Sequence, residues 1–242
     1  MKKISMIILC VLFVVTNSFA QGSKKEIEKA QKSGKTIFLI VTDKTAKGTD
    51  ALIKIAENTK KKAKNTEVVK LDRDDKANAA LIAKYRLAGA PLPMVLVVAT
   101  TDVVTGALSV SDASVEKLIA DIPSKNQADV LLGFENGKAA LIICGKKNAK
   151  DKDALMAECK SAAASLGNKA SVVFIDIDNK DEANFIALLN PDKTKTTVLI
   201  FNGKGQYTGV HESKAKSTEL VKAVNKKVGG CAPGSCGSGK KC

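Results

Sequence analysis

Two stretches of the chain repeat the same pattern of apolar and polar positions. One begins GKTIFLIVTDKTAKGTDALIKIA at Gly34, and the other begins GKAALIICGKKNAKDKDALMAEC at Gly137. They align without a gap at an offset of 103 residues, so that Asp50 matches Asp153. A repeat of this length indicates two copies of a domain and not a solenoid of short units.

Each copy predicts the order helix, strand, helix, strand, helix, strand, strand, helix. Unbroken apolar runs between turn residues are typical of buried strands, and apolar residues three or four positions apart are typical of helices that pack by one face. The predicted strands are 37–41, 68–71, 94–98 and 107–110, then 140–144, 172–177, 198–201 and 206–210. The predicted helices are 24–33, one through Leu52 and Ala63, 77–85 and 115–119, then 126–135, one through Leu155 and Leu166, 181–189 and 218–224. This order predicts an α/β sandwich in each copy.

The element order, together with YRLAGAPLPMVLVV from Tyr85 to Val98, resembles the thioredoxin fold. In that family a proline with a cis peptide bond precedes the third strand, so the resemblance implies that Pro91 or Pro93 is this proline. The implied fold class is α/β, with two tandem thioredoxin-like, three-layer α/β/α domains and mixed sheets. We place the first domain at 21–124 and the second at 125–228.

The pattern of an active thioredoxin is incomplete in both copies. Active thioredoxins place Cys-x-x-Cys just after the first strand, at a helix N-terminus that stabilises a thiolate. This chain has TDKTAKGT at 42–49 and GKKNAKDK at 145–152, and neither stretch contains a cysteine. The second copy has KTT, at 195–197, where the proline is expected. Because disulfide exchange needs an attacking thiolate, we predict that both domains are redox-inactive.

The N-terminus predicts export. Lys2 and Lys3 precede an apolar run at 4–15, and a short polar segment lies between this run and the end of the stretch at Ala20. This layout is typical of a secretory signal peptide, here 1–20, with cleavage after Ala20. The run is shorter than the ~20 residues of a membrane-spanning helix, although a retained anchor is the alternative. We expect a periplasmic or secreted protein with no transmembrane segment after cleavage.

The C-terminal residues 229–242, GGCAPGSCGSGKKC, are too small and polar to form a core, which predicts a disordered tail. They include Cys231, Cys236 and Cys242. Four alternatives stay open. One disulfide, most easily Cys231–Cys236, is the first. The three thiolates as ligands of Cu or Zn are the second. Thiol exchange with another exported protein is the third, and a tail without a specific role is the fourth.

The remaining candidate residues favour structural roles. Cys144 and Cys159 fall on apolar positions, which predicts buried thiols that do not bond to each other. His211 is expected in a turn after the last strand. Four aspartates alternate at strand ends, and we interpret them as solvated side chains paired with neighbouring lysines and not as a Ca²⁺ loop. They are Asp72, Asp74, Asp176 and Asp178.

Composition narrows the class of partner. The formal net charge is +14, or +12 without Lys2 and Lys3, but the only arginines are Arg73 and Arg86 and aromatic residues make up 4%. Proteins that bind nucleic acid commonly use bidentate arginine contacts and aromatic rings that stack on bases. This chain has few arginines and few aromatic residues, so no nucleic-acid partner is expected. The leading hypothesis is a binding or adaptor module, without catalytic residues or a cofactor, for another exported or envelope protein. The alternative is a thiol-disulfide oxidoreductase, or soft-metal binding or delivery, acting through the tail.

Overall fold

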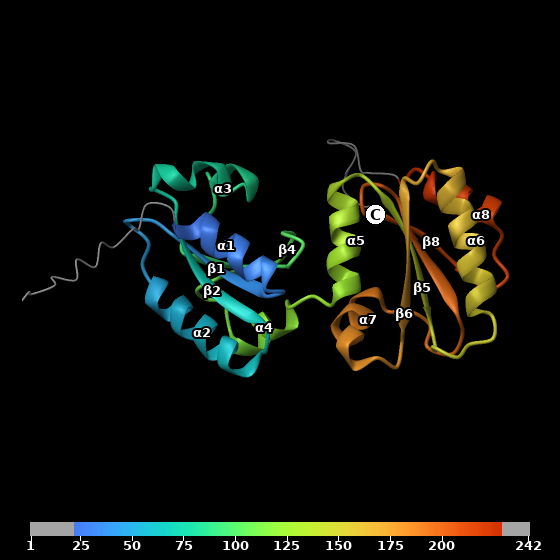
Figure 1. Ribbon diagram of the computed structural model, residues 1–242, viewed down its shortest axis with the longest axis horizontal. Coiled ribbons are helices and arrows are strands. Elements are labelled where there is room, and N and C mark those ends of the chain that lie inside the picture. The colour runs from blue at the N-terminus through green and yellow to red at the C-terminus, as the bar shows by residue number, and fades with distance from the viewer. Residues whose placement is uncertain (1–21, 229–242) are drawn as a thin grey trace, which may run out of the picture.

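The computed structural model describes residues 22–228, which form two lobes joined between α4 (Val115–Ala120) and α5 (Lys125–Glu135) (Figure 1). Each lobe is one copy of the repeat, with a four-stranded mixed sheet between two layers of helices. The structure confirms the predicted α/β class and the two tandem three-layer domains. Ala20 and the tail lie outside the described residues.

The elements follow the predicted order in both domains. The first domain runs α1 (Gly22–Lys32), β1 (Thr36–Thr42), α2 (Thr49–Lys62), β2 (Thr66–Asp72), η2 (Lys76–Asn78), α3 (Ala79–Lys84), β3 (Met94–Val98), β4 (Val104–Ser109) and α4 (Val115–Ala120). The second runs α5 (Lys125–Glu135), β5 (Ala139–Gly145), α6 (Lys152–Ser165), β6 (Ala170–Asp176), η3 (Lys180–Glu182), α7 (Ala183–Leu189), β7 (Thr197–Phe201), β8 (Tyr207–Glu212) and α8 (Ser217–Val224).

The two sheets share one topology. Their strand orders are β2-β1-β3-β4 and β6-β5-β7-β8. The pairs β1/β2 and β5/β6 are parallel, whereas the other neighbouring strands are antiparallel. This order and these directions are those of the thioredoxin-like fold, so the predicted resemblance is confirmed in both copies.

The central strands are buried on both faces, which explains their unbroken apolar runs. In β1, Ile37 and Leu39 pack with α1 and α3, while Phe38 and Ile40 pack with α2 and α4. Alternate residues of a strand point to opposite faces, so each residue from Ile37 to Val41 belongs to one of two cores. The same division holds in β5, with α5 and α7 on one face and α6 and α8 on the other.

The two cysteines of the second domain lie on opposite faces of its sheet. Cys144 packs in the α5/α7 core and Cys159 in the α6/α8 core, and both thiols are fully buried and free. The predicted absence of a bond between them is confirmed, because the sheet itself separates them. The prediction for His211 was wrong, because β8 continues through Glu212 and His211 pairs with Val198.

A buried carboxylate holds the chain where one domain passes into the next. Glu182 accepts hydrogen bonds from Ser124 Oγ and Asn126 Nδ2, both at 2.6 Å, and it is 5% exposed. Ser124 also caps α5 by accepting from the backbone N–H of Gln127. The start of α5 is therefore fixed to the η3/α7 segment of its own domain.

Candidate functional site

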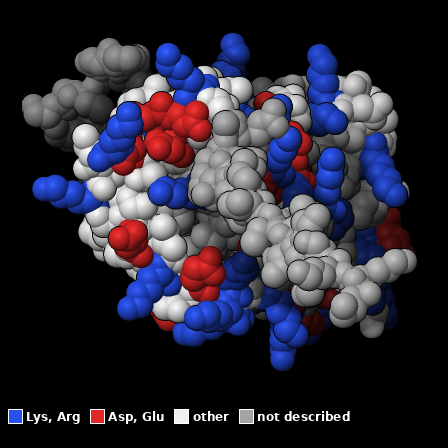
Figure 2. Space-filling model, turned by 60° about the vertical axis from the view of Figure 1, so that its left-hand side comes forward, with Lys and Arg blue, Asp and Glu red and all other residues white. Residues whose placement is uncertain are grey.

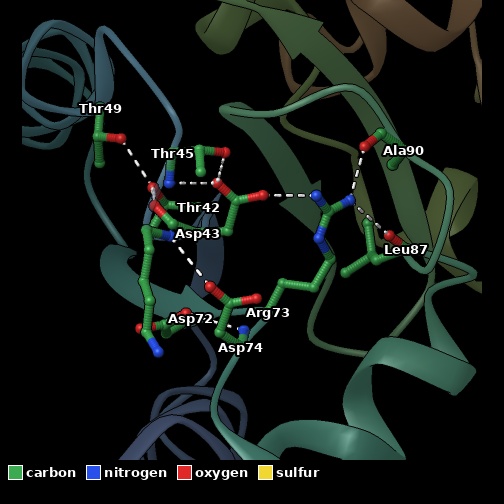
Figure 3. Close-up of polar contacts among 10 residues, drawn as sticks. Thr42, Asp43, Thr45, Thr49, Asp72, Arg73, Asp74, Leu87 and Ala90 are labelled. Atoms are coloured by element: carbon green, nitrogen blue, oxygen red, sulfur yellow. Dashed lines mark hydrogen bonds and ion pairs between the residues drawn. The ribbon is translucent and has the colours of Figure 1, made fainter.

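The end of β1, where a thioredoxin has its dithiol, carries a polar network (Figure 3). Arg73, the first residue after β2, pairs with Asp43, the first residue after β1, at 2.5 Å. The same guanidinium donates to the carbonyl oxygens of Ala90, at 2.8 Å, and Leu87, at 3.4 Å. We call this set of contacts the Arg73 latch. It ties together the chain segments that follow β1, follow β2 and precede β3.

Asp43 is held as a carboxylate. Its Oδ1 accepts hydrogen bonds from the hydroxyl and the backbone N–H of Thr45, both at 2.9 Å. These contacts, with a smaller contribution from Arg73, lower the pKa of Asp43 below its ordinary value. The place of an attacking thiolate is thus taken by a carboxylate whose charge is compensated. Such a group fixes the loop that follows β1.

The two domains differ at the residue before the third strand. Of the two candidate prolines in the first domain, Pro93 has the cis peptide bond. Thr196 stands at the corresponding place in the second domain and donates its hydroxyl to Asp151 Oδ1 at 2.7 Å. A Cβ at Gly145 would meet Thr196 Cγ2 at 2.9 Å, so the end of β5 requires a glycine. The sequence alone did not decide whether Pro91 or Pro93 has the cis peptide bond of the first domain.

The aspartates at the strand ends bond to backbone amides. Asp72 accepts from the N–H of Asp74, Asp74 accepts from that of Lys44, and Asp176 accepts from that of Asp178. The predicted pairing with lysine side chains was therefore wrong for Asp72, Asp74 and Asp176, because backbone N–H groups of the nearby turns donate to these carboxylates instead. Within residues 22–228, no group of three or more His, Cys, Asp or Glu side chains could hold a metal ion.

Beside the Arg73 latch lies a hollow of about 670 Å³, which we call the domain-1 groove. Its volume falls within the ~300–1,000 Å³ of typical ligand sites. The groove has an apolar floor from β3, β4 and the segment before them, formed by Leu87, Met94, Leu96, Val104 and Ala107. Polar and small residues form its walls: Lys84, Tyr85, Arg86, Ala90, Asp102 and, from the second domain, Glu135.

Asp102 organises one wall of the domain-1 groove. It takes a left-handed backbone conformation, with φ of 72°, in the turn between β3 and β4. Its carboxylate accepts from Tyr85 Oη at 2.6 Å and from Gln31 Nε2 at 3.0 Å, and it pairs with Lys84. Burial, and then the charge of Glu135, raise the pKa of Tyr85 to about 12. The phenol therefore stays protonated at neutral pH.

The second domain fills the corresponding positions with aromatic side chains. Phe134, Phe201 and Tyr207 occupy the places of Gln31, Val98 and Val104, and adjacent ring centroids lie 5.8 and 5.7 Å apart. The three aromatic rings in contact cover one face of the sheet with large apolar side chains. The sequence prediction missed the groove residues, although the aligned repeat already contains these three differences.

The other predicted site residues lie outside the described part of the chain. Cys231, Cys236 and Cys242 are among them, so the disulfide, the Cu or Zn site and the free thiols stay predictions. The described residues contain no helix that is both long and apolar enough to cross a membrane. On the face drawn in Figure 2, Lys and Arg side chains are scattered, with Asp and Glu between them.

No protein-family model matches the chain, and no curated protein matches it in sequence. Solved structures do match. The N-terminal domain of alkylhydroperoxide reductase AhpF from Enterococcus faecalis is 14% identical, over 83% of this chain and 98% of that one, with a TM-score of 0.27. The first two thioredoxin domains of Saccharomyces cerevisiae Eps1p are 11% identical, over 86% and 97%, with a TM-score of 0.33. Human ERp44 is 11% identical, over 83% and 54%, with a TM-score of 0.35. The assignment of the fold rests on strand order and direction, and no activity follows from these matches.

Proposed function

We propose that this chain is an exported, non-catalytic binding protein that holds an extended segment of another exported protein in the domain-1 groove. The observation that carries the proposal is the groove itself, an apolar floor with hydrogen-bonding walls. Export is supported by the signal-like sequence at 1–20.

The chemistry around the groove supports binding without catalysis. The Arg73 latch, next to the groove, has a compensated carboxylate where an oxidoreductase needs a thiolate. The two described cysteines are buried in the other domain, and burial raises the pKa of each to about 12. At neutral pH such thiols are almost entirely protonated, so they do not attack a disulfide.

The floor and walls indicate the kind of segment bound. An extended peptide points alternate side chains to one side, so one apolar side chain can enter the groove while its neighbours face the rim. Burial of apolar surface supplies roughly 25 cal/mol per Å². The rim offers donors on Arg86 and the acceptor Glu135 to the peptide backbone and polar side chains. The preferred ligand is therefore a polypeptide segment that combines apolar and polar residues.

A groove-filling substitution tests this site. Ala107 is exposed on β4 and lines the groove, so Ala107→Trp fills the space without replacing a core side chain. Val210 is the control, because it occupies the same place on β8 and is 50% exposed. We expect Ala107→Trp to weaken binding of a fluorescent, carboxymethylated unfolded polypeptide about tenfold or more, and Val210→Trp to leave it within about twofold. Equal effects from both variants, with unchanged unfolding midpoints, would contradict the proposal.

A further inference from the structure

The Arg73 latch has no counterpart in the second domain. Lys146 is the first residue after β5, where the first domain has Asp43, and Ile177 is the first residue after β6, where the first domain has Arg73. The replacement removes both members of the ion pair. A hollow of about 220 Å³ lies here, which we call the domain-2 hollow.

The walls of the domain-2 hollow combine lysines with apolar groups. The lining residues come from the loop after β5, the position directly after β6 and the loop before β7, and include Lys146, Ala149, Ile177, Lys193, Lys195 and Thr196. The volume is below the ~300–1,000 Å³ of typical small-molecule sites. The hollow therefore suits one side chain of a larger ligand.

Two of its lysines are available to a ligand. Lys195 is already paired with Glu212, at 2.6 Å, and with Asp192, at 3.7 Å. By contrast, Lys146 and Lys193 form no ion pair with another described residue, and both are exposed.

The carboxylates nearby already have hydrogen-bond partners. Asp151 accepts from the Thr196 hydroxyl, and Asp192 accepts from the hydroxyl and the N–H of Thr194. Asp176 accepts from the N–H of Asp178. None of these carboxylates lines the hollow, and every charged residue that does line it is a lysine: Lys146, Lys193 and Lys195.

We propose that the domain-2 hollow binds a glutamate or aspartate side chain of an acidic polypeptide segment. The lysine ammonium groups pair with the carboxylate, and Ile177 and Ala149 contact its methylene groups. In the first domain the guanidinium of Arg73 and the carboxylate of Asp43 already satisfy each other. The site lies on a different domain from the groove, so each can be tested alone.

The test compares two double variants that remove the same charge. The probe is a fluorescent peptide of twelve residues, alternating Glu and Ala, measured by anisotropy on the full chain at low ionic strength. We expect Lys146→Ala with Lys193→Ala to weaken binding about tenfold or more. The control, Lys44→Ala with Lys47→Ala on the matching loop of the first domain, is expected to stay within about twofold. Equal losses in both would overturn the proposal, because the binding would then depend on net charge alone.

Two further measurements sharpen the result. Lys146→Asp with Ile177→Arg rebuilds the latch in the second domain and is expected to abolish peptide binding, provided that its unfolding midpoint matches the wild type. Glutarate should displace the peptide at lower concentration than inorganic phosphate does at equal ionic strength. Preferential displacement by phosphate would contradict a carboxylate site. Ala107→Trp should leave this binding unchanged, which separates a failure here from a failure of the domain-1 groove.

Discussion

The two thiols in the second domain should be nearly inert while the protein is folded. Burial raises the pKa of Cys144 to about 12, and burial with a smaller contribution from Glu158 raises that of Cys159 to about 12. At pH 8 the thiolate fraction of such a group is about 10⁻⁴, against roughly 0.2 for an unperturbed cysteine of pKa near 8.5. Because the thiolate is the nucleophile, we expect alkylation about a thousandfold slower than for a free thiol.

The assay is timed alkylation of the reduced, folded chain, with the modified positions identified by mass spectrometry. Cys231, Cys236 and Cys242 should be modified at the rate of a model peptide thiol, whereas Cys144 and Cys159 should react only after unfolding in guanidinium. Chain unfolded from the start is the control, in which these five cysteines react together. Modification of Cys144 or Cys159 in the folded state within tenfold of the model rate would refute the reasoning.

Three other substitutions test contacts in the fold. Glu182→Ala leaves Ser124 and Asn126 without their acceptor and should cost about 1–3 kcal/mol in urea unfolding; a loss below ~0.5 kcal/mol would contradict a structural role. Lys35 and Lys60 lower the pKa of Glu67 from 4.5 to about 2, so its stabilisation is present above pH 4.5 and is lost toward pH 2. Glu67→Gln should remove that part of the acid dependence, and an unchanged pH profile would count against it. Arg73→Leu should speed amide hydrogen exchange in loop 43–48 about tenfold; unchanged exchange would show that the latch does not fix this loop.

The fold was predictable because its strongest signals are local. Strands buried on both faces require unbroken apolar runs, and the repeat presented each run twice. The start of β4 was predicted less well, at 107 instead of Val104, because that edge strand is only partly buried and carries a weaker apolar pattern. His211 was misplaced for a similar reason: only one residue of β8 is buried, and the pairing of β8 with β7 sets the end of the strand.

At the candidate site, the sequence predicted only that the Cys-x-x-Cys motif is missing. The sequence shows that neither domain has a Cys-x-x-Cys, but the contact of Arg73 with Asp43 joins residues 30 positions apart that follow two different strands. Such a contact depends on strand order, which a single sequence does not specify. The domain-1 groove depends on the second domain as well, since Glu135 forms part of its wall.

The central claim is that this chain binds polypeptide segments without thiol chemistry. The most direct test compares the wild type with a chain that carries Cys231→Ser, Cys236→Ser and Cys242→Ser. Affinity for a carboxymethylated unfolded polypeptide and the rate of insulin reduction are measured side by side. We predict the same affinity for both chains and no insulin reduction above the dithiothreitol background by either. Loss of binding in the serine variant, or insulin reduction that the three substitutions abolish, would contradict the claim.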